Sequence, residues 1–409
     1  MAEKRRFAGV AIAGISFQAG STAVDSATIM SALVFQLTGS SILVGLVTAV
    51  LRFGWLFPQL FVGFLATRSG SSMHYYKIGA FGRATAMALM AALLWLGGGL
   101  PTSLLAFFVM ILWVAYAFIS GIVAVPYNDI VARAVPSRLR SRLLATRFFG
   151  GGVLALGVVG VADRLAGTYA FPLSYAAIIA MASALMFVSS FVFSAMGEPE
   201  TAQGSPKKPG FLAYLRTGKE VFRKDFRFRR FVYAQWCGGA VLMAMPFYVV
   251  YASVSGFDLA RVAWLLGAQT LGALLSNFLW GWWGDHLGKV SLLKAIALGR
   301  IVPALAILFL AFFATADNAD LFYVFLVIFF VTGALANGLT IAVIGFLMEI
   351  SPEDQRPAYS GYFNAITAPA FLLPLAAGII ASLFGLLLVF ALSAVAALAQ
   401  FLLLRTIRA

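Results

Sequence analysis

The sequence predicts an all-α integral membrane protein, with twelve transmembrane helices in two pseudo-symmetric six-helix bundles. Its composition is the first observation. Of the 409 residues, 62% are hydrophobic and only 11% are charged, and the mean hydropathy is +0.95. Soluble domains are roughly 25% charged and 45–50% apolar. A water-soluble fold of this length could not bury so much apolar surface. The other observations are the number of long apolar runs and an internal repeat.

Twelve runs are long and apolar enough to cross a bilayer, for which a helix needs about 20 residues. They cover roughly 8–37, 41–66, 75–97, 103–131, 142–163, 172–196, 229–254, 260–283, 291–315, 320–349, 357–380 and 383–404. The basic start at residues 4–6 is similar to that of a signal peptide. The run behind it is too long for one and contains Asp25, so we expect a retained first span.

Basic residues set the expected orientation. Lys and Arg concentrate before the first span, in every second loop and after the last span, whereas the opposite loops contain only Arg164 and Arg261. The positive-inside rule therefore places both termini and the central loop in the cytoplasm, most simply at a bacterial inner membrane. The net charge of +14 is then a topology signal and not evidence for nucleic-acid binding. Residues 211–230 also fit a basic amphipathic helix on anionic lipid.

The chain repeats itself at an offset of about 216–218 residues. GFLATRSGSSMHYYKIGAFGR at 63–83 matches GWWGDHLGKVSLLKAIALGR at 281–300, and VPSRLR at 135–140 matches SPEDQR at 351–356. Gln18 and Gln235 fall on the same offset. A repeat of half the chain predicts two six-span bundles, residues 1–196 and 229–409, joined by a cytoplasmic linker at 197–228.

One repeated stretch, GWWGDHLGK, resembles the loop signature of the major facilitator superfamily, which lies between spans 2 and 3 and between spans 8 and 9. The matching residues are Gly281, Asp285, Gly288 and Lys289, with Val290 in place of the second basic residue. The first-half copy keeps Gly63, Arg68 and Gly70 but has Thr67 where the family has Asp.

The resemblance implies a two-bundle transporter that works by alternating access around a site at the membrane midplane, with spans 1, 4, 7 and 10 lining the cavity. Two sequence patterns that are typical of proton-coupled members and of antiporters are not matched by this sequence. Ala117 stands four residues before Gly121 where those members have Arg, and the span-5 glycine run FFGGGVLALGVVG contains no Pro. These differences argue against a drug/proton antiporter of the common type.

Asp25 is the only acidic residue between Phe7 and Leu37. It lies about twelve residues before the outer end of span 1, and Arg52 lies about eleven residues into span 2, so both are roughly 17–18 Å deep. Charges in a bilayer pair or face water, so we expect the two to face each other. Three interpretations stay open: a permanent structural ion pair, a proton-coupling site at Asp25, or an Arg52 anchor for an anionic substrate.

Polar and soft side chains on the cavity spans are candidate substrate contacts, although each also fits interhelical packing. They are Gln18, Ser21, Thr28, Tyr116, Ser120, Tyr127, Gln235, Trp236, Met243, Tyr248, Tyr251, Asn337 and Thr340. Charged and glycine residues at the inner ends of the spans are candidates for a cytoplasmic gate. They are Gly281, Asp285, Gly288, Lys289, Arg68, Arg83, Arg300, Asp129, Arg133, Glu349 and Arg356. For Arg83 and Arg300, snorkelling to the membrane surface is the alternative.

No pattern of enzyme chemistry, metal ligation or cofactor binding is recognisable. Both histidines fall in expected loops, the single cysteine lies in an apolar run, and no glycine run carries the Lys-Ser/Thr of a nucleotide-binding loop. We expect a monomeric secondary transporter in contact with lipid, which couples proton flow to export of a small amphipathic or hydrophobic compound. Two alternatives are proton-coupled uptake of an organic anion anchored by Arg52 and a non-transporting membrane scaffold or assembly factor.

The orientation can be tested by cysteine labelling. Ser205 lies in the linker expected on the cytoplasmic side. A Ser205→Cys variant, with Cys237 replaced by Ser, should react with a membrane-impermeant maleimide in inside-out vesicles and stay unlabelled in intact cells. Labelling in intact cells would reverse the orientation.

Overall fold

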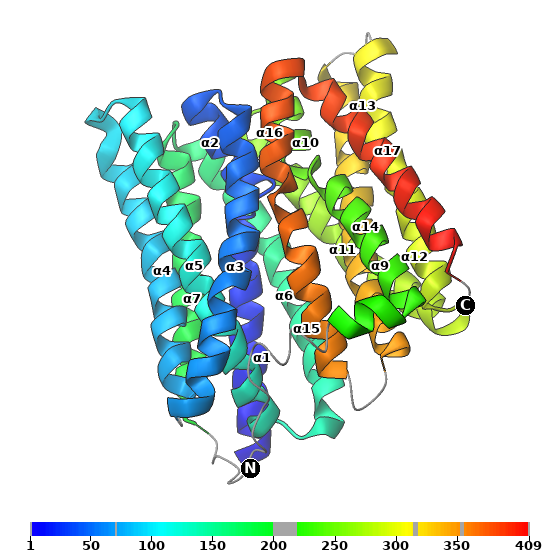
Figure 1. Cartoon of the computed structure of the whole chain (residues 1–409). Coiled ribbons are helices and arrows are strands. Elements are labelled where there is room, and N and C mark those ends of the chain that lie inside the picture. Colours follow the sequence, from blue (N-terminus) through cyan, green and yellow to red (C-terminus); the bar gives the residue numbers. More distant parts are fainter. Residues whose placement is uncertain (1, 70–71, 199–218, 314–317, 352–355, 408–409) are drawn as a thin grey trace. The chain divides into compact units, whose positions relative to one another are not determined.

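The computed structural model describes residues 2–69, 72–198, 219–313, 318–351 and 356–407, and every regular element in these ranges is helical (Figure 1). The first half contains α1 (Ala2–Ala23), α2 (Ile29–Thr38), α3 (Ser41–Ser69), α4 (Ser72–Leu96), η1 (Gly97–Gly99), α5 (Thr102–Ala134), α6 (Ser137–Thr168) and α7 (Leu173–Ser194). The second half contains α9 (Phe226–Leu242), α10 (Met245–Val254), α11 (Leu259–His286), α12 (Lys289–Gly299), α13 (Ile301–Phe313), α14 (Asn318–Ile350), α15 (Arg356–Thr367), η2 (Ala368–Leu372), α16 (Leu373–Phe384) and α17 (Leu386–Arg405).

Within the described residues, 11 segments are long and apolar enough to cross a membrane, and the short apolar helix Ile29–Thr38 belongs to the first expected span. The predicted all-α membrane architecture is therefore confirmed. Of the expected amphipathic helix at 211–230, residues 219–224 are helical, while 211–218 lie outside the described residues.

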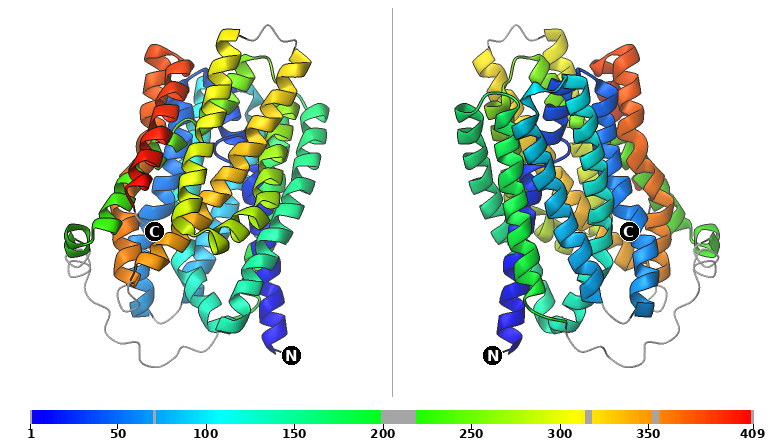
Figure 2. Two further views of the ribbon diagram at one scale, coloured as in Figure 1. Left: turned by 90° about the vertical axis from the view of Figure 1, so that its right-hand side faces the viewer. Right: turned by 90° about the vertical axis from the view of Figure 1, so that its left-hand side faces the viewer.

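The chain folds into two compact units. The first is Met1–Gln203 with Val249–Gly267, and the second is Gly204–Tyr248 with Ala268–Ala409. In the first unit the long helices α3 to α7 run alternately in opposite directions, as their short connections require (Figure 2). α4 packs against both α5 and α7, and α1 packs against α6 and α7.

The first span is not a continuous helix, which corrects the expectation for residues 8–37. α1 ends at Ala23 and α2 begins at Ile29. The span that begins the second half breaks at the equivalent place, between the end of α9 at Leu242 and the start of α10 at Met245. The second break interrupts apolar sequence, whereas the first lies in a stretch that contains Asp25, Ser26 and Thr28, residue types that favour helix starts.

Glycines bring equivalent helix pairs of the two halves into backbone contact. A Cβ added to Gly121 in α5 would lie 2.5 Å from the Gly54 carbonyl oxygen of α3. In the second half, a Cβ on Gly272 of α11 would strike the Phe330 carbonyl, and one on Gly333 of α14 would strike the Gln269 carbonyl. Small residues permit such close packing in membranes, where van der Waals contact is a main source of helix association.

The glycine contacts predict opposite effects for two identical substitutions. Gly121→Ala should destabilise the protein, because its methyl group meets the backbone of α3, and overpacking costs about 1–3 kcal/mol. Gly157→Ala in α6 is the matched control, since nothing lies within 4 Å of its added Cβ. It should be neutral or stabilising by up to about 1 kcal/mol through helix propensity. Thermal unfolding in detergent measures both, and equal effects would contradict the packing assignment.

Candidate functional site

Asp25 lies in the break of the first span and binds the start of the following half-helix. Its Oδ1 accepts hydrogen bonds from the Ala27 backbone N–H at 3.0 Å and the Thr28 hydroxyl at 2.9 Å. Its backbone carbonyl accepts from Met30 N–H at 3.1 Å. The carboxylate thus sits at the N-terminus of α2, where unpaired amides and the helix dipole favour negative charge. The side chain whose charge is unfavourable in the membrane thus provides acceptors to the residues that lead into α2.

Arg52, from α3, is the charged side chain that interacts electrostatically with Asp25. α2 packs directly against α3, so the two charges lie on consecutive segments that are in contact. Among the candidate contacts of span 1, Gln18 and Ser21 lie on α1, whereas Thr28 follows the end of that helix at Ala23. Thr28 is a hydrogen-bond donor to Asp25, while the Ser21 hydroxyl donates to the Gln18 carbonyl at 2.9 Å.

The polar side chains of span 4 lie on α5 and face the interior of the first unit. Tyr116 and Ser120 are buried and Tyr127 is half-buried. The Tyr116 ring stacks on Trp113 with 5.2 Å between centroids. Neither the Ser120 hydroxyl nor the Tyr127 hydroxyl has a hydrogen-bond partner among the described residues.

In the second half, several predicted cavity residues make structural contacts. The Trp236 indole N–H donates to the Ile366 carbonyl at 3.1 Å, and the Asn337 amide donates to Asn277 Oδ1 at 2.6 Å. Tyr248 is buried against Phe390, with 4.9 Å between centroids. For these three, interhelical packing explains the side chain. The remaining positions are half-buried Gln235 and Tyr251, buried Met243 at the break and exposed Thr340.

A charged cluster joins three helix ends in the first unit. Arg133 Nη2 lies 2.6 Å from Asp129 Oδ2 and 2.9 Å from Glu198 Oε1. The Glu198 carboxylate also accepts from the backbone N–H groups of Ser72 at 2.8 Å and Met73 at 3.3 Å. It therefore binds the N-terminus of α4 and the last turn of α5 together. The four-residue spacing of Asp129 and Arg133 is typical of an ion pair on one helix face. Glu198 is distant in sequence, so no spacing indicates its contact with Arg133.

The signature loop of the second half has a related arrangement. Gly288 adopts a φ of 84°, which glycine tolerates without strain, and α12 begins directly after it. Lys289 Nζ lies 2.8 Å from Asp285 Oδ1, and its stem runs over Gly345 of α14. Glu349 is exposed. Of the other predicted gate residues, the side chains of Arg68 and Arg356 lie outside the described residues.

Arg83 and Arg300 are buried inside their own halves, with 5% and 7% of their surface exposed. The snorkelling interpretation is therefore wrong for both. Arg300 donates to the Gly238 carbonyl at 3.2 Å and to Gln400 Oε1 at 3.4 Å. Arg83 instead stacks on the Phe17 ring at 3.7 Å from its centroid.

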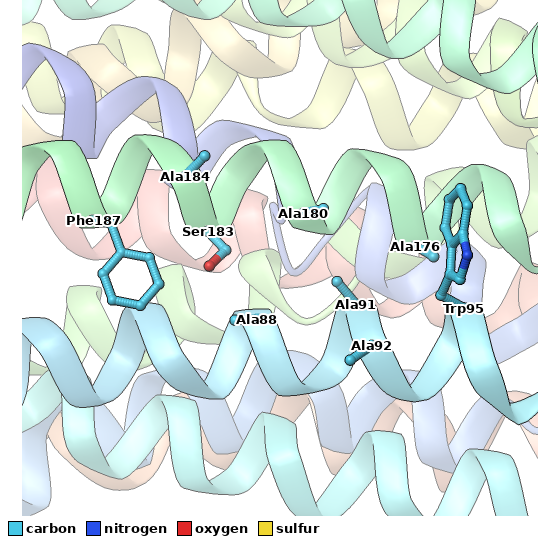
Figure 3. Close-up of a pocket in the computed structure, with 9 residues that line it drawn as sticks. All are labelled: Ala88, Ala91, Ala92, Trp95, Ala176, Ala180, Ser183, Ala184 and Phe187. Carbon is cyan, nitrogen blue, oxygen red and sulfur yellow. The ribbon is translucent and has the colours of Figure 1, made fainter.

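An apolar groove of about 400 Å³ lies between α4 and α7 (Figure 3). Alanines from both helices line it, and Trp95 and Phe187 stand at its two ends. Ser183 supplies its only hydroxyl, which donates to the Ala84 carbonyl at 2.9 Å. The groove thus offers no free polar group to a solute, and we do not place the transport site there.

The long apolar helices, the matched breaks and the duplicated packing define an integral membrane protein made of two related halves. Residues 238–408 match the sequence profile of the Major Facilitator Superfamily. This part of the sequence is therefore similar to that superfamily, and solved structures of transporters show the same fold over nearly the whole chain.

A mutant of the nucleoside transporter NupG is similar over 98% of this chain and 99% of its own, with a TM-score of 0.77 and 13% identity. A POT family transporter in complex with a thioalcohol-conjugated peptide matches over 98% and 95%, with a TM-score of 0.71 and 10% identity. A bacterial homologue of the iron transporter ferroportin matches over 99% and 98%, with a TM-score of 0.60 and 16% identity. A search of curated protein sequences found no match.

The charged cluster predicts a stability effect that depends on its partner. Glu198→Gln should lower the free energy of unfolding by about 1–3 kcal/mol, because charge-assisted hydrogen bonds to Arg133 and to α4 are lost. The effect should shrink in an Arg133→Gln background, since the two share an interaction. Glu220→Gln, at an exposed site, is the control. Equal effects of the two glutamate variants in detergent unfolding would contradict the cluster.

Proposed function

We propose that the protein is a secondary-active transporter, which moves a small organic solute by alternating access and couples this movement to a proton at Asp25. The observation that carries the proposal is the position of Asp25 in the break of the first span, beside Arg52. Interrupted helices in transporters expose backbone groups and helix termini to a solute or ion near the midplane. The superfamily match and the fold support the transporter class.

The coupling follows from the two sets of groups around the carboxylate. Ala27 N–H and Thr28 belong to the same segment as Asp25, so they move with it. Arg52 belongs to α3, and a movement between α2 and α3 would change its distance from the carboxylate. Separation of a carboxylate from a guanidinium favours protonation, and approach favours release. A conformational cycle can therefore bind and release one proton at this position.

The specific form that we propose is proton-coupled export of a small amphipathic compound. The aromatic side chains Tyr116 and Tyr127 on α5 would suit a partly apolar solute. Uptake of an organic anion held by Arg52 is the second candidate. It requires Arg52 to exchange Asp25 for the substrate, and the Arg52 variants below separate it from proton coupling.

Asp25→Asn should abolish accumulation driven by a pH gradient while it preserves counterflow exchange, because exchange needs no net proton cycle. The assay uses proteoliposomes and a solute selected by thermal stabilisation of the purified protein. Solute accumulation measured under the two opposite pH gradients gives the direction of transport. Solute binding should also lose its pH dependence in the variant, since binding and protonation are reciprocally linked. Gradient-driven accumulation by a stable Asp25→Asn protein would rule out the coupling role.

A static ion pair predicts a different result in the same variants. Asp25→Asn would then remove the opposite charge that acts on Arg52 and should lower the melting temperature. The double variant Asp25→Asn/Arg52→Gln would restore much of that stability. Melting temperatures of the two single variants and the double variant distinguish these cases. If Arg52 instead anchors an anion, Arg52→Gln alone removes solute binding.

A further inference from the structure

The first unit contains several buried polar atoms that have no hydrogen-bond partner among the residues that the structure describes. Four of them are Arg83 Nε, Ser120 Oγ, Tyr127 Oη and Arg147 Nε. An unpaired buried polar group is costly, so such groups are uncommon and call for a ligand or water. All four of these groups can donate, and the two guanidinium nitrogens can only donate. The two hydroxyls are neutral acceptors, so the cluster has no negatively charged acceptor among its own four groups.

Arg147 reaches this interior because α6 lies directly against α1. A Cβ on Gly150 or Gly151 would meet Ile15 or Gln18 of α1. One turn earlier on the same face of α6, the Arg147 side chain occupies the space that a Cβ on Gly14 would fill. The absence of a side chain at Gly14 thus admits a guanidinium between the helices. Its Cζ lies 5.1 Å from the centroid of the Tyr127 ring.

Arg83 approaches the same tyrosine from α4. Its Cζ lies 3.7 Å from the centre of the Phe17 ring, which orients the guanidinium plane. Tyr76 and Tyr127 both interact electrostatically with Arg83 and with Arg147. The two guanidiniums therefore flank a pair of phenols. Among the described residues, Arg83 interacts with aromatic side chains and with no carboxylate.

Buried arginines elsewhere in the described chain do have acceptors. Arg300, at the equivalent position of the repeat, donates to the Gly238 carbonyl and to Gln400. Arg133 pairs with Asp129 and Glu198. A buried charge is normally paired because its desolvation is so costly. Arg83 differs from both, because its interactions among the described residues are with aromatic side chains.

We propose that the first unit binds the oxyanion group of a small organic solute, a carboxylate or a phosphate, between Arg83 and Arg147, with Tyr127 and Ser120 as further donors. Guanidinium groups suit such oxygens in charge and in geometry. The Phe17, Tyr76 and Tyr127 rings would contact the apolar part of the solute. The site differs from an Arg52 anchor, and its identification as a substrate site rests on the proposed transport function.

Equilibrium binding to the purified protein in detergent tests the site without any transport. The probes are benzoate and inorganic phosphate, with benzamide as an uncharged match for benzoate. We expect saturable binding of at least one of the two anions, measured by isothermal titration calorimetry, and none of benzamide. Arg147→Gln should weaken the anion about tenfold or more. Arg164→Gln is the control, because it removes an exposed arginine from the same helix. Binding of neither anion, or equal effects of the two arginine variants, would overturn the proposal.

Two further variants keep the test valid if Arg147→Gln unfolds. Gly14→Ala retains both charges but places a methyl group where the Arg147 stem lies, so it should weaken the anion as well. Tyr127→Phe removes one donor hydroxyl and should weaken binding several-fold with little change in melting temperature. Unchanged anion affinity in both folded variants would contradict the site. Competition by phosphatidylglycerol micelles would assign the site to lipid phosphate and overturn the solute proposal.

The outcome separates this site from the coupling mechanism. Anion binding that depends on Arg147, together with normal pH-driven transport in Asp25→Asn, would retain the site and reject the proton role. Loss of pH-driven transport in Asp25→Asn without any anion binding would support the proton role and reject the anion site.

Discussion

The bilayer requires every buried backbone group and charge to find a partner within the protein, and the break at Asp25 is the place where this requirement shapes the fold most visibly. The carboxylate satisfies amides freed by the break, and the break gives the carboxylate its donors. Arg52 supplies the opposite charge from α3. Each part would be unfavourable in hydrocarbon without the others, so the half-helices, the acid and the base depend on one another.

The same requirement explains how the ends of the spans are held. In the first unit, Glu198 provides acceptors to the free amides of α4 and to Arg133. Near the start of α9, Asp225 accepts from Phe228 N–H at 3.0 Å and from the Tyr359 hydroxyl at 2.9 Å, which ties α9 to α15. The two halves thus fix their helix ends with acidic residues at different sequence positions. Duplication preserved the packing of the spans, while the polar contacts diverged.

Much of the architecture could be predicted from the sequence, because span length and apolar composition depend on local residues alone. The repeat likewise follows from motifs such as those ending in Arg83 and Arg300. Span length alone did not predict the break in the first span, although Asp25 and Thr28 are residue types that start helices and thus provided a local signal. The buried position of Arg147 could not be predicted, for another reason. Its burial depends on Gly14, more than a hundred residues away, and no spacing rule connects them.

The breaks in the first span of each half differ in one chemical respect. The break in the first half contains Asp25, whereas Met243 and Ala244 occupy the break in the second half, and neither of them can ionise. The protein therefore has this break twice and a titratable group in one of the two. If protons couple through these breaks, the two halves contribute unequally: one side carries the charge, and its counterpart supplies only a hinge. The coupling ratio at the breaks is then fixed at a single proton per cycle, by the composition of five residues.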